Sequence, residues 1–129
     1  MKDNEYSDLK LLNIRKSNKI YSIDEIKKLS KEIFDKYKVN KVYLFGSYSR
    51  GEATSKSDID IMIVGGNINT LEMLSKFALE LVKLFKKEFD IVNEEKYTKK
   101  KDKESNEYFE LANQLFYKEV CQERILIYG

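Results

Sequence analysis

The sequence predicts an α/β (α+β) domain in which helices flank a small mixed β-sheet. Stretches in which apolar residues recur at helical spacing alternate with short runs of β-branched and aromatic residues. The connections between those runs differ in length, and the differences indicate which strands pair antiparallel and which parallel. A chain of 129 residues, 42% hydrophobic and 36% charged, fits one globular unit with a heavily charged surface.

Residues 1–20 are predicted to form a polar arm outside a domain that spans 21–129. Their one apolar feature is a leucine cluster at Leu9, Leu11 and Leu12, which could support one or two turns of helix. The stretch lacks the apolar core of a signal peptide. No window of the chain approaches the apolar length of a membrane span, so no membrane association is expected.

The first long helix is predicted to start after Ser22. Ser22 and Glu25 form the pattern of a capping box, in which each side chain accepts a hydrogen bond from a free backbone N–H of the first turn. Apolar residues then follow at helical spacing, namely Ile23, Ile26, Leu29, Ile33 and Tyr37. We expect this helix to end near Val39 and Asn40.

Two strands are predicted next, at 41–45 and 58–64. KVYLF at 41–45 is bounded by Asn40 and Gly46 and is typical of a buried strand. DIDIMIV at 58–64 alternates between two faces. One face carries Ile59, Ile61 and Ile63, and the other carries Asp58, Asp60, Met62 and Val64.

The second half of the chain predicts two more helices and two more strands. A long amphipathic helix from about residue 71 to 85 has Thr70 or Asn69 as its cap, and a short strand covers 89–92. A charged loop is expected at 93–105, and a terminal strand at 124–128. The helix between them places one set of residues on one face: Tyr108, Leu111, Ala112, Leu115, Phe116 and Val120.

Connection lengths predict how the strands pair. Twelve residues, 46–57, join the first two strands, which is marginal for a parallel crossover, so we expect antiparallel pairing with a short helical turn between them. The 24 residues at 65–88 hold a crossover helix comfortably, so the third strand can run parallel to the second. A mixed sheet with flanking helices follows.

Two carboxylates share one face of the second strand. Asp58 and Asp60 stand at positions i and i+2, so they lie within reach of each other and repel. Aspartate is also a poor strand former. A divalent cation between them would keep both ionised, because it turns the repulsion into coordination. Magnesium prefers such hard oxygen ligands and completes its shell with water and substrate phosphates.

A glycine-serine turn precedes the carboxylates. Gly46 follows a buried strand directly, where a glycine lets the backbone approach a phosphate closely. Ser47 can offer both its N–H and its hydroxyl, and a short helix beginning there would add free N–H groups. Phosphate donors at one strand end and a metal pair on the neighbouring strand together predict a nucleoside triphosphate site.

A third carboxylate could complete this site. Asp90 is the first candidate because it lies on the third strand of the same sheet, and Glu88, which projects from the same face, is the second. With three carboxylates, two metal ions could be bridged, one at the attacking hydroxyl and one at the leaving pyrophosphate.

Cysteine and histidine usage narrows the chemistry further. Cys121 is the only cysteine, so no intrachain disulfide can form, and a reducing cytoplasm is the expected location. The chain has no histidine, which removes the usual general base and the commonest zinc ligand. Any metal must therefore be held by oxygen, which favours magnesium or manganese.

Each of these features alone has a plain structural explanation. An Asp-x-Asp pair on an exposed strand is usually solvated charge, a Gly-Ser pair is usually a turn, and an aspartate at a strand edge is usually a surface residue. Their order along the chain carries more weight than the parts. A strand is followed by Gly-Ser, ten residues of which the last is a serine, a strand that begins with Asp-x-Asp, a helix and a strand with an aspartate.

The stretch FGSYSRGEATSKSDIDIMIV at 45–64 resembles the signature of the DNA polymerase beta superfamily of nucleotidyltransferases. More narrowly, it resembles the minimal nucleotidyltransferases, small proteins often encoded beside HEPN-domain partners as antitoxins. In that family Gly-Ser is followed by ten residues and Asp-x-Asp, which is the spacing from Gly46-Ser47 to Asp58-x-Asp60. The resemblance covers roughly 22–129 and implies the nucleotidyltransferase fold.

Further positions match the family pattern. The frequent Arg-Gly after the turn corresponds to Arg50-Gly51, the serine before the first aspartate to Ser57, and the third carboxylate to Asp90. The closing ILIYG is similar to the terminal strand of the small members.

The resemblance implies a role for each matching residue. Asp58 and Asp60 would bind two magnesium or manganese ions, and Asp90 would complete the metal site nearest the acceptor and take its proton. Gly46 and Ser47 would hold the terminal phosphates of ATP. Arg50 would neutralise phosphate charge, or else pair with Glu52 at the surface. Ser57 belongs to the same nucleotide-binding motif, although we expect it to cap the turn before the aspartates rather than to touch substrate.

The implied reaction is transfer of AMP from ATP to a tyrosine of a HEPN toxin. Two alternatives stay open: a binding module that neutralises its partner by masking, and an enzyme that modifies a small molecule such as an aminoglycoside. The lysine-rich stretch 96–105 could bind RNA or phosphate, but a solvated loop of mixed charge is the simpler interpretation, so direct nucleic-acid binding is not expected. Dimerisation or a complex with the partner could build the acceptor cleft.

Overall fold

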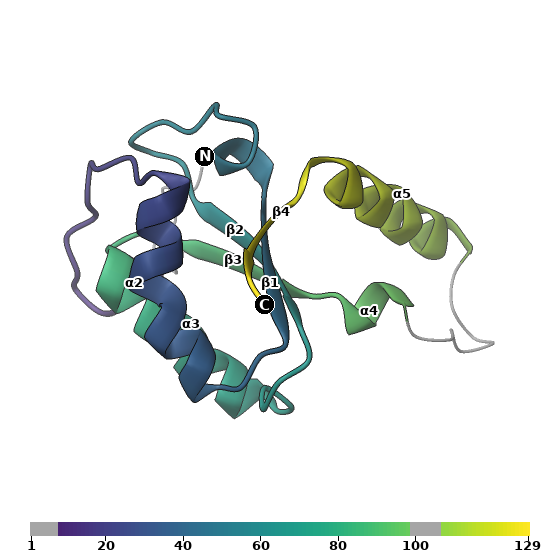
Figure 1. Cartoon of the computed structure of the whole chain (residues 1–129), viewed down its shortest axis with the longest axis horizontal. Helices are drawn as coiled ribbons and strands as arrows, with labels where there is room; N and C mark the ends of the chain where they lie inside the picture. Colours follow the sequence, from purple (N-terminus) through teal and green to yellow (C-terminus); the bar gives the residue numbers. More distant parts are fainter. Residues whose placement is uncertain (1–7, 99–106) are drawn as a thin grey trace.

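The computed structural model describes residues 8–98 and 107–129, and its centre is a four-stranded sheet (Figure 1). The strands are β1 (Lys41–Phe45), β2 (Ile59–Val64), β3 (Phe89–Asn93) and β4 (Ile125–Tyr128), in the order β3-β2-β1-β4. β1 runs antiparallel to both β2 and β4, whereas β2 and β3 are parallel. The predicted mixed sheet, the antiparallel first pair and the parallel crossover are therefore confirmed.

Helices cover both faces of this sheet. In chain order they are α1 (Asp8–Leu11), α2 (Ile23–Lys36), the 3₁₀ turn η1 (Gly46–Tyr48), α3 (Leu71–Phe85), α4 (Glu95–Thr98) and α5 (Glu107–Glu123). α2 and α3 lie on one side of the sheet, and α4 and α5 lie on the other (Figure 1). The short connection between β1 and β2 holds η1, which is the helical turn expected there.

Helix α2 ends three residues earlier than predicted. Tyr37 is its C-cap, and Lys38 follows with a φ of 56°. Backbone N–H groups of Lys38 and Val39 donate to the carbonyls of Asp35 and Phe34, which closes the helix end. A glycine usually marks such a left-handed position. Because a lysine fills it here, the sequence carried no stop signal.

The charged segment after β3 is not wholly a loop, as it was predicted to be. Its start forms the short helix α4, and the side chain of Asn93 accepts a hydrogen bond from the N–H of Glu95 at 3.0 Å. This is the local side-chain contact that favours a helical turn. Residues 99–106, which hold most of the lysine-rich stretch, lie outside the described residues.

The main core lies between the sheet and the helices α2 and α3. The isoleucine face of β2 points into it, as predicted from the alternation, and Ile59, Ile61 and Ile63 are fully buried. Aromatic rings fill the space above them. The Phe34 and Phe77 rings lie 6.0 Å apart, and Phe77 meets Tyr37 edge-on at 5.2 Å.

A smaller apolar cluster lies on the other face, beneath α4 and α5. Phe45, Met62 and Val120 are buried there, with aromatic side chains of both helices packed around them. At the end of α5, Arg124 donates to Glu94 at 2.7 Å and covers the ring of Tyr43, with its guanidinium carbon 3.9 Å from the ring centre.

The predicted packing face of the last helix is only partly correct. Phe116 and Val120 contact the sheet, but Tyr108, Leu111 and Leu115 are 85%, 54% and 58% exposed. This face of the sheet carries few apolar side chains, because β2 and β3 turn aspartates toward it. It can therefore bury only the C-terminal part of α5. We call Tyr108, Leu111 and Leu115 the α5 apolar face.

The N-terminal arm packs against the edge of the sheet. Leu9 in α1 is 4% exposed, and its N–H donates to the carboxylate of Glu88 at 2.9 Å. Further along the arm, the N–H of Ser17 donates to the carbonyl of Lys86 at 2.9 Å. The arm is thus attached to the turn that leads from α3 into β3. Within the described ranges, every helix is too short or too polar to cross a membrane.

The N-terminus of α2 has the predicted capping box. Removing this capping box should cause a measurable loss of stability. The Ser22 hydroxyl accepts from the N–H of Glu25 at 3.1 Å, and Glu25 accepts from the N–H of Ser22 at 2.9 Å. Ser22→Ala should lower the free energy of unfolding by about 1 kcal/mol in urea denaturation. Ser75→Ala, at an exposed position within α3, is the control and should not destabilise. Equal stability of Ser22→Ala and the wild type would contradict the prediction.

Candidate active site

Two of the predicted carboxylates occupy paired positions on neighbouring strands. Asp60 on β2 is the register partner of Asp90 on β3, and these strands run parallel. Residues paired in this way project from the same face of a sheet. Asp58 precedes β2 by one residue and shares the alternation of Asp60, as expected from the sequence. The face concerned is the one beneath α4 and α5.

The glycine-serine turn lies directly against Asp60. Gly46 follows β1, whose last residue Phe45 is the register partner of Asp60. Gly46 has a φ of 73°, and a Cβ built on it would lie 2.1 Å from a carboxylate oxygen of Asp60. No side chain fits in that space. The turn therefore brings bare backbone against the carboxylate, which suits a site where phosphate and metal meet.

Replacing Gly46 tests this close approach, and Gly51 supplies a matched control. Both glycines have positive φ, 73° and 71°, but a Cβ at Gly51 would meet nothing within 4 Å. Gly51→Ala should therefore lose only about 1 kcal/mol from backbone strain. Gly46→Ala carries the same strain and also displaces Asp60, so we expect it to abolish the activity predicted from the sequence, nucleotidyl transfer.

The measurement pairs urea denaturation with an assay of pyrophosphate release. If Gly46→Ala and Gly51→Ala both released pyrophosphate at nearly the wild-type rate, the close approach of Gly46 to Asp60 would not be needed for activity.

The other residues of the turn have protein partners in this structure. Arg50 donates from Nε to Glu52 and from Nη1 to Glu123, each at 2.8 Å. The surface pairing with Glu52 considered from the sequence is thus present, with a second carboxylate added. Glu123 also accepts from the N–H of Gly46 at 3.2 Å. Ser47 is half-buried in η1.

Ser57 closes the turn before the carboxylates. Its hydroxyl accepts from the N–H of Thr54 at 2.8 Å, and its own N–H donates to the carbonyl of Thr54 at 3.1 Å. Ser57 therefore caps the loop that carries Asp58, which agrees with the capping role expected from its position.

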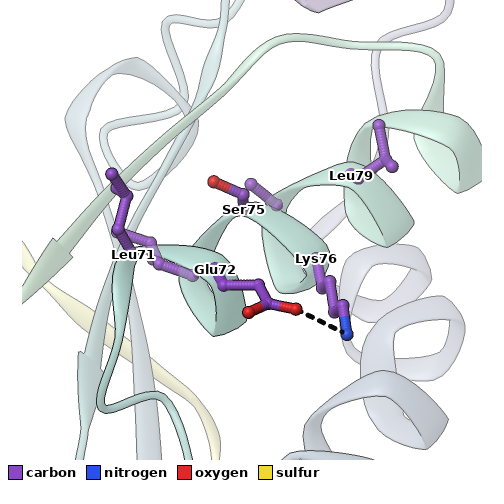
Figure 2. A pocket seen from close by; sticks show the side chains of 7 residues that line it. Leu71, Glu72, Ser75, Lys76 and Leu79 are labelled. Carbon is purple, nitrogen blue, oxygen red and sulfur yellow. Dashed lines mark ion pairs between the residues drawn. The ribbon is translucent and has the colours of Figure 1, made fainter.

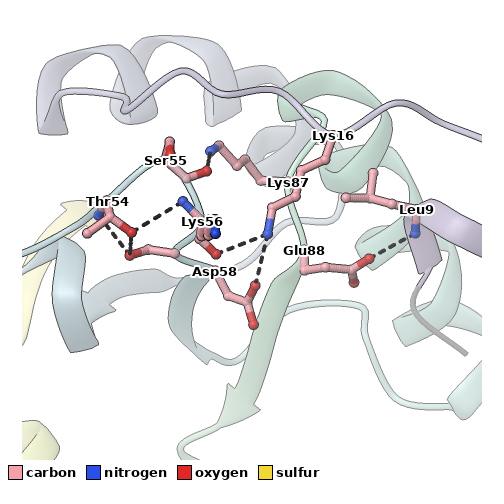
Figure 3. Close-up of polar contacts among 9 residues, drawn as sticks. Leu9, Lys16, Thr54, Ser55, Lys56, Asp58, Lys87 and Glu88 are labelled. Atoms are coloured by element: carbon pink, nitrogen blue, oxygen red, sulfur yellow. Dashed lines mark hydrogen bonds and ion pairs between the residues drawn. The ribbon is translucent and has the colours of Figure 1, made fainter. Parts of the chain in front are cut away.

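Two lysines lie beside Asp58 (Figure 3). Lys16 from the N-terminal arm has its Nζ 4.0 Å from an Asp58 oxygen and donates to the carbonyl of Lys56 at 3.0 Å. Lys87, at the turn into β3, donates to the carbonyl of Ser55 at 2.7 Å. Both contacts attach the loop at 54–58 to neighbouring segments. Lys16 provides part of the positive charge near Asp58.

Lys87 is an unusual residue for its position because its side chain is buried. Burial lowers the pKa of the Lys87 amine, the positive charge of Lys16 lowers it further, and the negative charge of Asp58 opposes both. A buried lysine needs a hydrogen-bond acceptor, and the Ser55 carbonyl supplies one. Lys87 is thus a structural support of the loop that presents Asp58.

The two remaining acidic candidates differ in their surroundings. Glu88 accepts from the N–H of Leu9, so it serves the attachment of the arm (Figure 3). Asp90 is exposed, and its negative charge reaches Tyr97. Burial raises the pKa of the Tyr97 hydroxyl most, and the charge of Asp90 raises it further. Tyr97 stacks on Tyr117 at 5.7 Å, so α4 brings aromatic rings to the edge of the site.

The donor chemistry of the three aspartates fits magnesium or manganese. All are carboxylates, and Asp60 lies in the space left by the missing side chain of Gly46. In this conformation their oxygens are not gathered. Within the part of the chain that the structure describes, no group of three or more His, Cys, Asp or Glu side chains is close enough to hold a metal ion.

Lys16, Lys87 and Glu123 were missed by the sequence reasoning. Lys16 and Glu123 lie far from the motif in the chain, and Lys87 lies among other lysines with no feature that marks it as buried. Glu88, two residues before Asp90, was considered only as the second choice for the third metal-binding carboxylate. No local spacing rule connects any of these residues to the turn at Gly46.

A separate groove lies along the outer side of α3 (Figure 2). It has a volume of about 680 Å³, and its lining includes Leu71, Leu74 and Leu79, with an ion pair of 3.3 Å between Glu72 and Lys76 at its side. None of the carboxylates of the site lines it. The groove therefore has no part in the chemistry discussed above.

Comparison with known families gives a match over most of the chain. Residues 26–125 match the family model described as the nucleotidyltransferase domain. A candidate protein adenylyltransferase of Methanocaldococcus jannaschii, MJ1379, is 60% identical over 42 residues, 32% of this chain and 42% of that protein. A second one, MJ0435, is 37% identical over 71 residues, 55% of this chain and 76% of that protein. The match to the first of these spans less than half of the relative's length.

Solved structures share the fold at low sequence identity. One chain of a toxin–antitoxin crystal structure with AMP-PNP superposes with a TM-score of 0.59 and 19% identity, covering 80% of this chain and 73% of that one. A candidate minimal nucleotidyltransferase gives 0.55 and 21%, covering 81% and 95%. These similarities concern the arrangement of the sheet and helices.

Proposed function

The chain belongs to the nucleotidyltransferase domain family, and from this premise we propose that it transfers AMP from ATP to a hydroxyl acceptor. The proposed acceptor is a tyrosine of a HEPN-domain toxin, which makes this chain the antitoxin of the pair. One observation carries the proposal above all others: Asp60 is paired with Asp90 across β2 and β3 while it lies against the bare backbone of Gly46.

The proposed reaction exchanges one phosphorus–oxygen bond for another. The acceptor hydroxyl forms a bond to the α-phosphorus of ATP as the bond from that phosphorus to the pyrophosphate oxygen breaks. The hydroxyl proton passes to the carboxylate of Asp90, and pyrophosphate leaves. The exposure of Asp90 allows an acceptor from another molecule to reach it. A carboxylate takes this part because the chain contains no histidine.

The aspartates also provide the metal ligands in this proposal. Asp58 and Asp60 would hold two magnesium or manganese ions, and Asp90 would hold the one nearest the acceptor. When bound, such ions neutralise the triphosphate and lower the pKa of the attacking hydroxyl. The N–H groups of the turn at Gly46 and Ser47, together with Arg50, bind the terminal phosphates, and Ser57 keeps the loop before Asp58 closed.

Two findings support a protein acceptor. The relatives MJ1379 and MJ0435 are named as protein adenylyltransferases, and the structure with AMP-PNP is named as a toxin–antitoxin complex. The α5 apolar face supplies an exposed surface on the same side of the sheet as the site, on which a partner protein could dock. The single cysteine, Cys121, is unpaired, which suits a protein that works in a reducing cytoplasm.

The test uses ATP labelled at the α-phosphate, magnesium, and a purified HEPN-domain protein as the candidate acceptor. We expect label on a tyrosine of the partner, release of pyrophosphate, and no label when ATP carries its isotope at the γ-phosphate. Peptide mass spectrometry locates the modified residue. Pyrophosphate release without label on the partner would reject the protein acceptor but keep the enzyme. Absence of both would reject the enzyme.

The α5 apolar face also favours a second candidate, neutralisation of the partner by masking. A masking protein needs a docking surface and no chemistry, so Asp60→Asn should bind the partner and still protect cells from it. An Asp60→Asn variant that binds but fails to protect would exclude masking as the sufficient mechanism.

A further inference from the structure

We propose that Glu123 is an internal anion that occupies a terminal-phosphate position of the nucleotide site and is displaced when the triphosphate binds. The proposal rests on the function proposed above, because it takes Gly46 and Arg50 as phosphate-binding groups. It adds a residue from the far end of the chain to the site, and it assigns that residue a competitive role rather than a supporting one.

The geometry of the Glu123 carboxylate is that of a bound anion. One oxygen accepts from the backbone N–H of Gly46 at 3.2 Å, and the other accepts from Nη1 of Arg50 at 2.8 Å. A backbone N–H at a turn and a guanidinium are the two donor types that proteins use most for phosphate oxygens. A single carboxylate thus bridges the two groups that the turn offers to a ligand.

The two anions compete for the same donors. Gly46 has one N–H, and Arg50 already donates from Nε to Glu52 at 2.8 Å, so it faces two carboxylates. These carboxylates, Glu52 first and Glu123 second, raise the pKa of Arg50 above its ordinary value. A triphosphate placed on the same donors would also repel the Glu123 charge. The single N–H of Gly46 and the charge repulsion therefore favour departure of the carboxylate when the triphosphate binds.

The departure of Glu123 can be a local event. Val120 is 1% exposed beneath α5, and Arg124 is attached to Glu94 at 2.7 Å and to the ring of Tyr43. The helix end is thus fixed on both sides of Glu123, and side-chain rotation suffices to release the donors. The side chains of Arg50 and Glu123 are 45% and 20% exposed, so an incoming nucleotide reaches them from solvent.

The opposite role would be a clamp in which Glu123 orients Arg50 for the phosphate. The two roles predict effects of opposite sign, because removing a competitor strengthens binding and removing a clamp weakens it. Glu123→Gln separates them: it keeps the size of the side chain and an acceptor for the N–H of Gly46, but it removes the charge that attracts Arg50.

The experiment measures binding by calorimetry, with AMP-PNP plus magnesium and, separately, with inorganic tripolyphosphate. For both ligands we expect Glu123→Gln to bind about threefold to tenfold more tightly than the wild type. Glu119→Gln, an exposed glutamate one turn earlier on α5, is the control and should bind like the wild type. Thermal melting of all variants confirms that the helix end is intact.

Arg50→Gln provides the second measurement. This variant should bind both ligands more weakly than the wild type, and the gain from Glu123→Gln should shrink when the two changes are combined, because they share one ion pair. If Glu123→Gln raised the affinity equally with and without Arg50, its effect would not act through the Arg50 ion pair. That result would overturn the proposed displacement of Glu123.

The outcomes distinguish this proposal from the function on which it rests. Unchanged or weaker binding by Glu123→Gln, in a protein whose wild type binds AMP-PNP and transfers label, overturns the anion exchange and leaves the enzyme standing. Binding of neither ligand by any variant overturns the exchange together with the triphosphate site. If the Glu123→Gln variant binds the ligands and no other form of the protein does, the displaced internal anion is supported most directly.

Discussion

Asp60→Asn should reduce the rate of nucleotidyl transfer by about 10³-fold or more, while the folded protein remains intact. Asparagine keeps the shape of the side chain but removes the charge that a divalent ion needs from its ligand. The loss of metal-derived charge stabilisation is worth several kcal/mol, and each 1.36 kcal/mol or so changes the rate tenfold. Asp60 is the most sensitive of the three positions because it lies against the turn at Gly46 and is the register partner of Asp90.

The measurement is pyrophosphate release under saturating ATP and magnesium. Glu32→Gln is the matched control because it removes an exposed charge on α2, which packs on the other face of the sheet. Its rate should equal that of the wild type. If Asp60→Asn retained more than about a tenth of the wild-type rate, Asp60 would not hold the metal that catalysis needs.

Phe77→Ala should cause the largest loss of stability, about 3–5 kcal/mol in the free energy of unfolding. Phe77 is fully buried in the main core, and its ring contacts those of Phe34 and Tyr37 at 6.0 and 5.2 Å. Truncation removes the transfer energy of the ring and leaves a cavity between α2 and α3. Urea denaturation at low temperature gives the difference between variant and wild type.

Two further variants keep the stability prediction testable if Phe77→Ala fails to fold. Phe77→Leu preserves part of the volume and should lose about 1–2 kcal/mol. Leu71→Ala, at a position that is 79% exposed at the start of α3, should change stability by less than about 0.5 kcal/mol. Equal losses for Phe77→Leu and Leu71→Ala would mean that the core does not depend on this ring.

Much of the fold could be predicted because its signals are local. The capping box at Ser22, the alternation along β2 and the lengths of two connections gave the start of α2, the faces of β2 and the relative directions of β1, β2 and β3. The end of α2 was not predictable, because Lys38 adopts a conformation for which a glycine is the usual signal. The exposure of Leu111 and Leu115 depends on what the sheet offers beneath α5, which no helix periodicity encodes.

The residues of the candidate site also fall into two groups, those that local sequence predicts and those that only tertiary packing brings together. Asp58, Asp60 and the turn at Gly46 form one compact motif, and their proximity follows from a single antiparallel pair. The contacts that modify the site come from distant parts of the chain: 77 residues separate Gly46 from Glu123, and 40 separate Lys16 from Lys56. Such pairings arise from the packing of whole elements, so residue spacing carries no trace of them.

The buried amine of Lys87 can serve as a chemical probe of how the loop at 54–58 moves. An acylating reagent should label exposed lysines such as Lys56 quickly, whereas Lys87 should react only when its hydrogen bond to Ser55 breaks and the loop lifts. The reaction time course at this one amine therefore reports how often the segment that presents Asp58 detaches from the body of the protein, with no dye or isotope introduced.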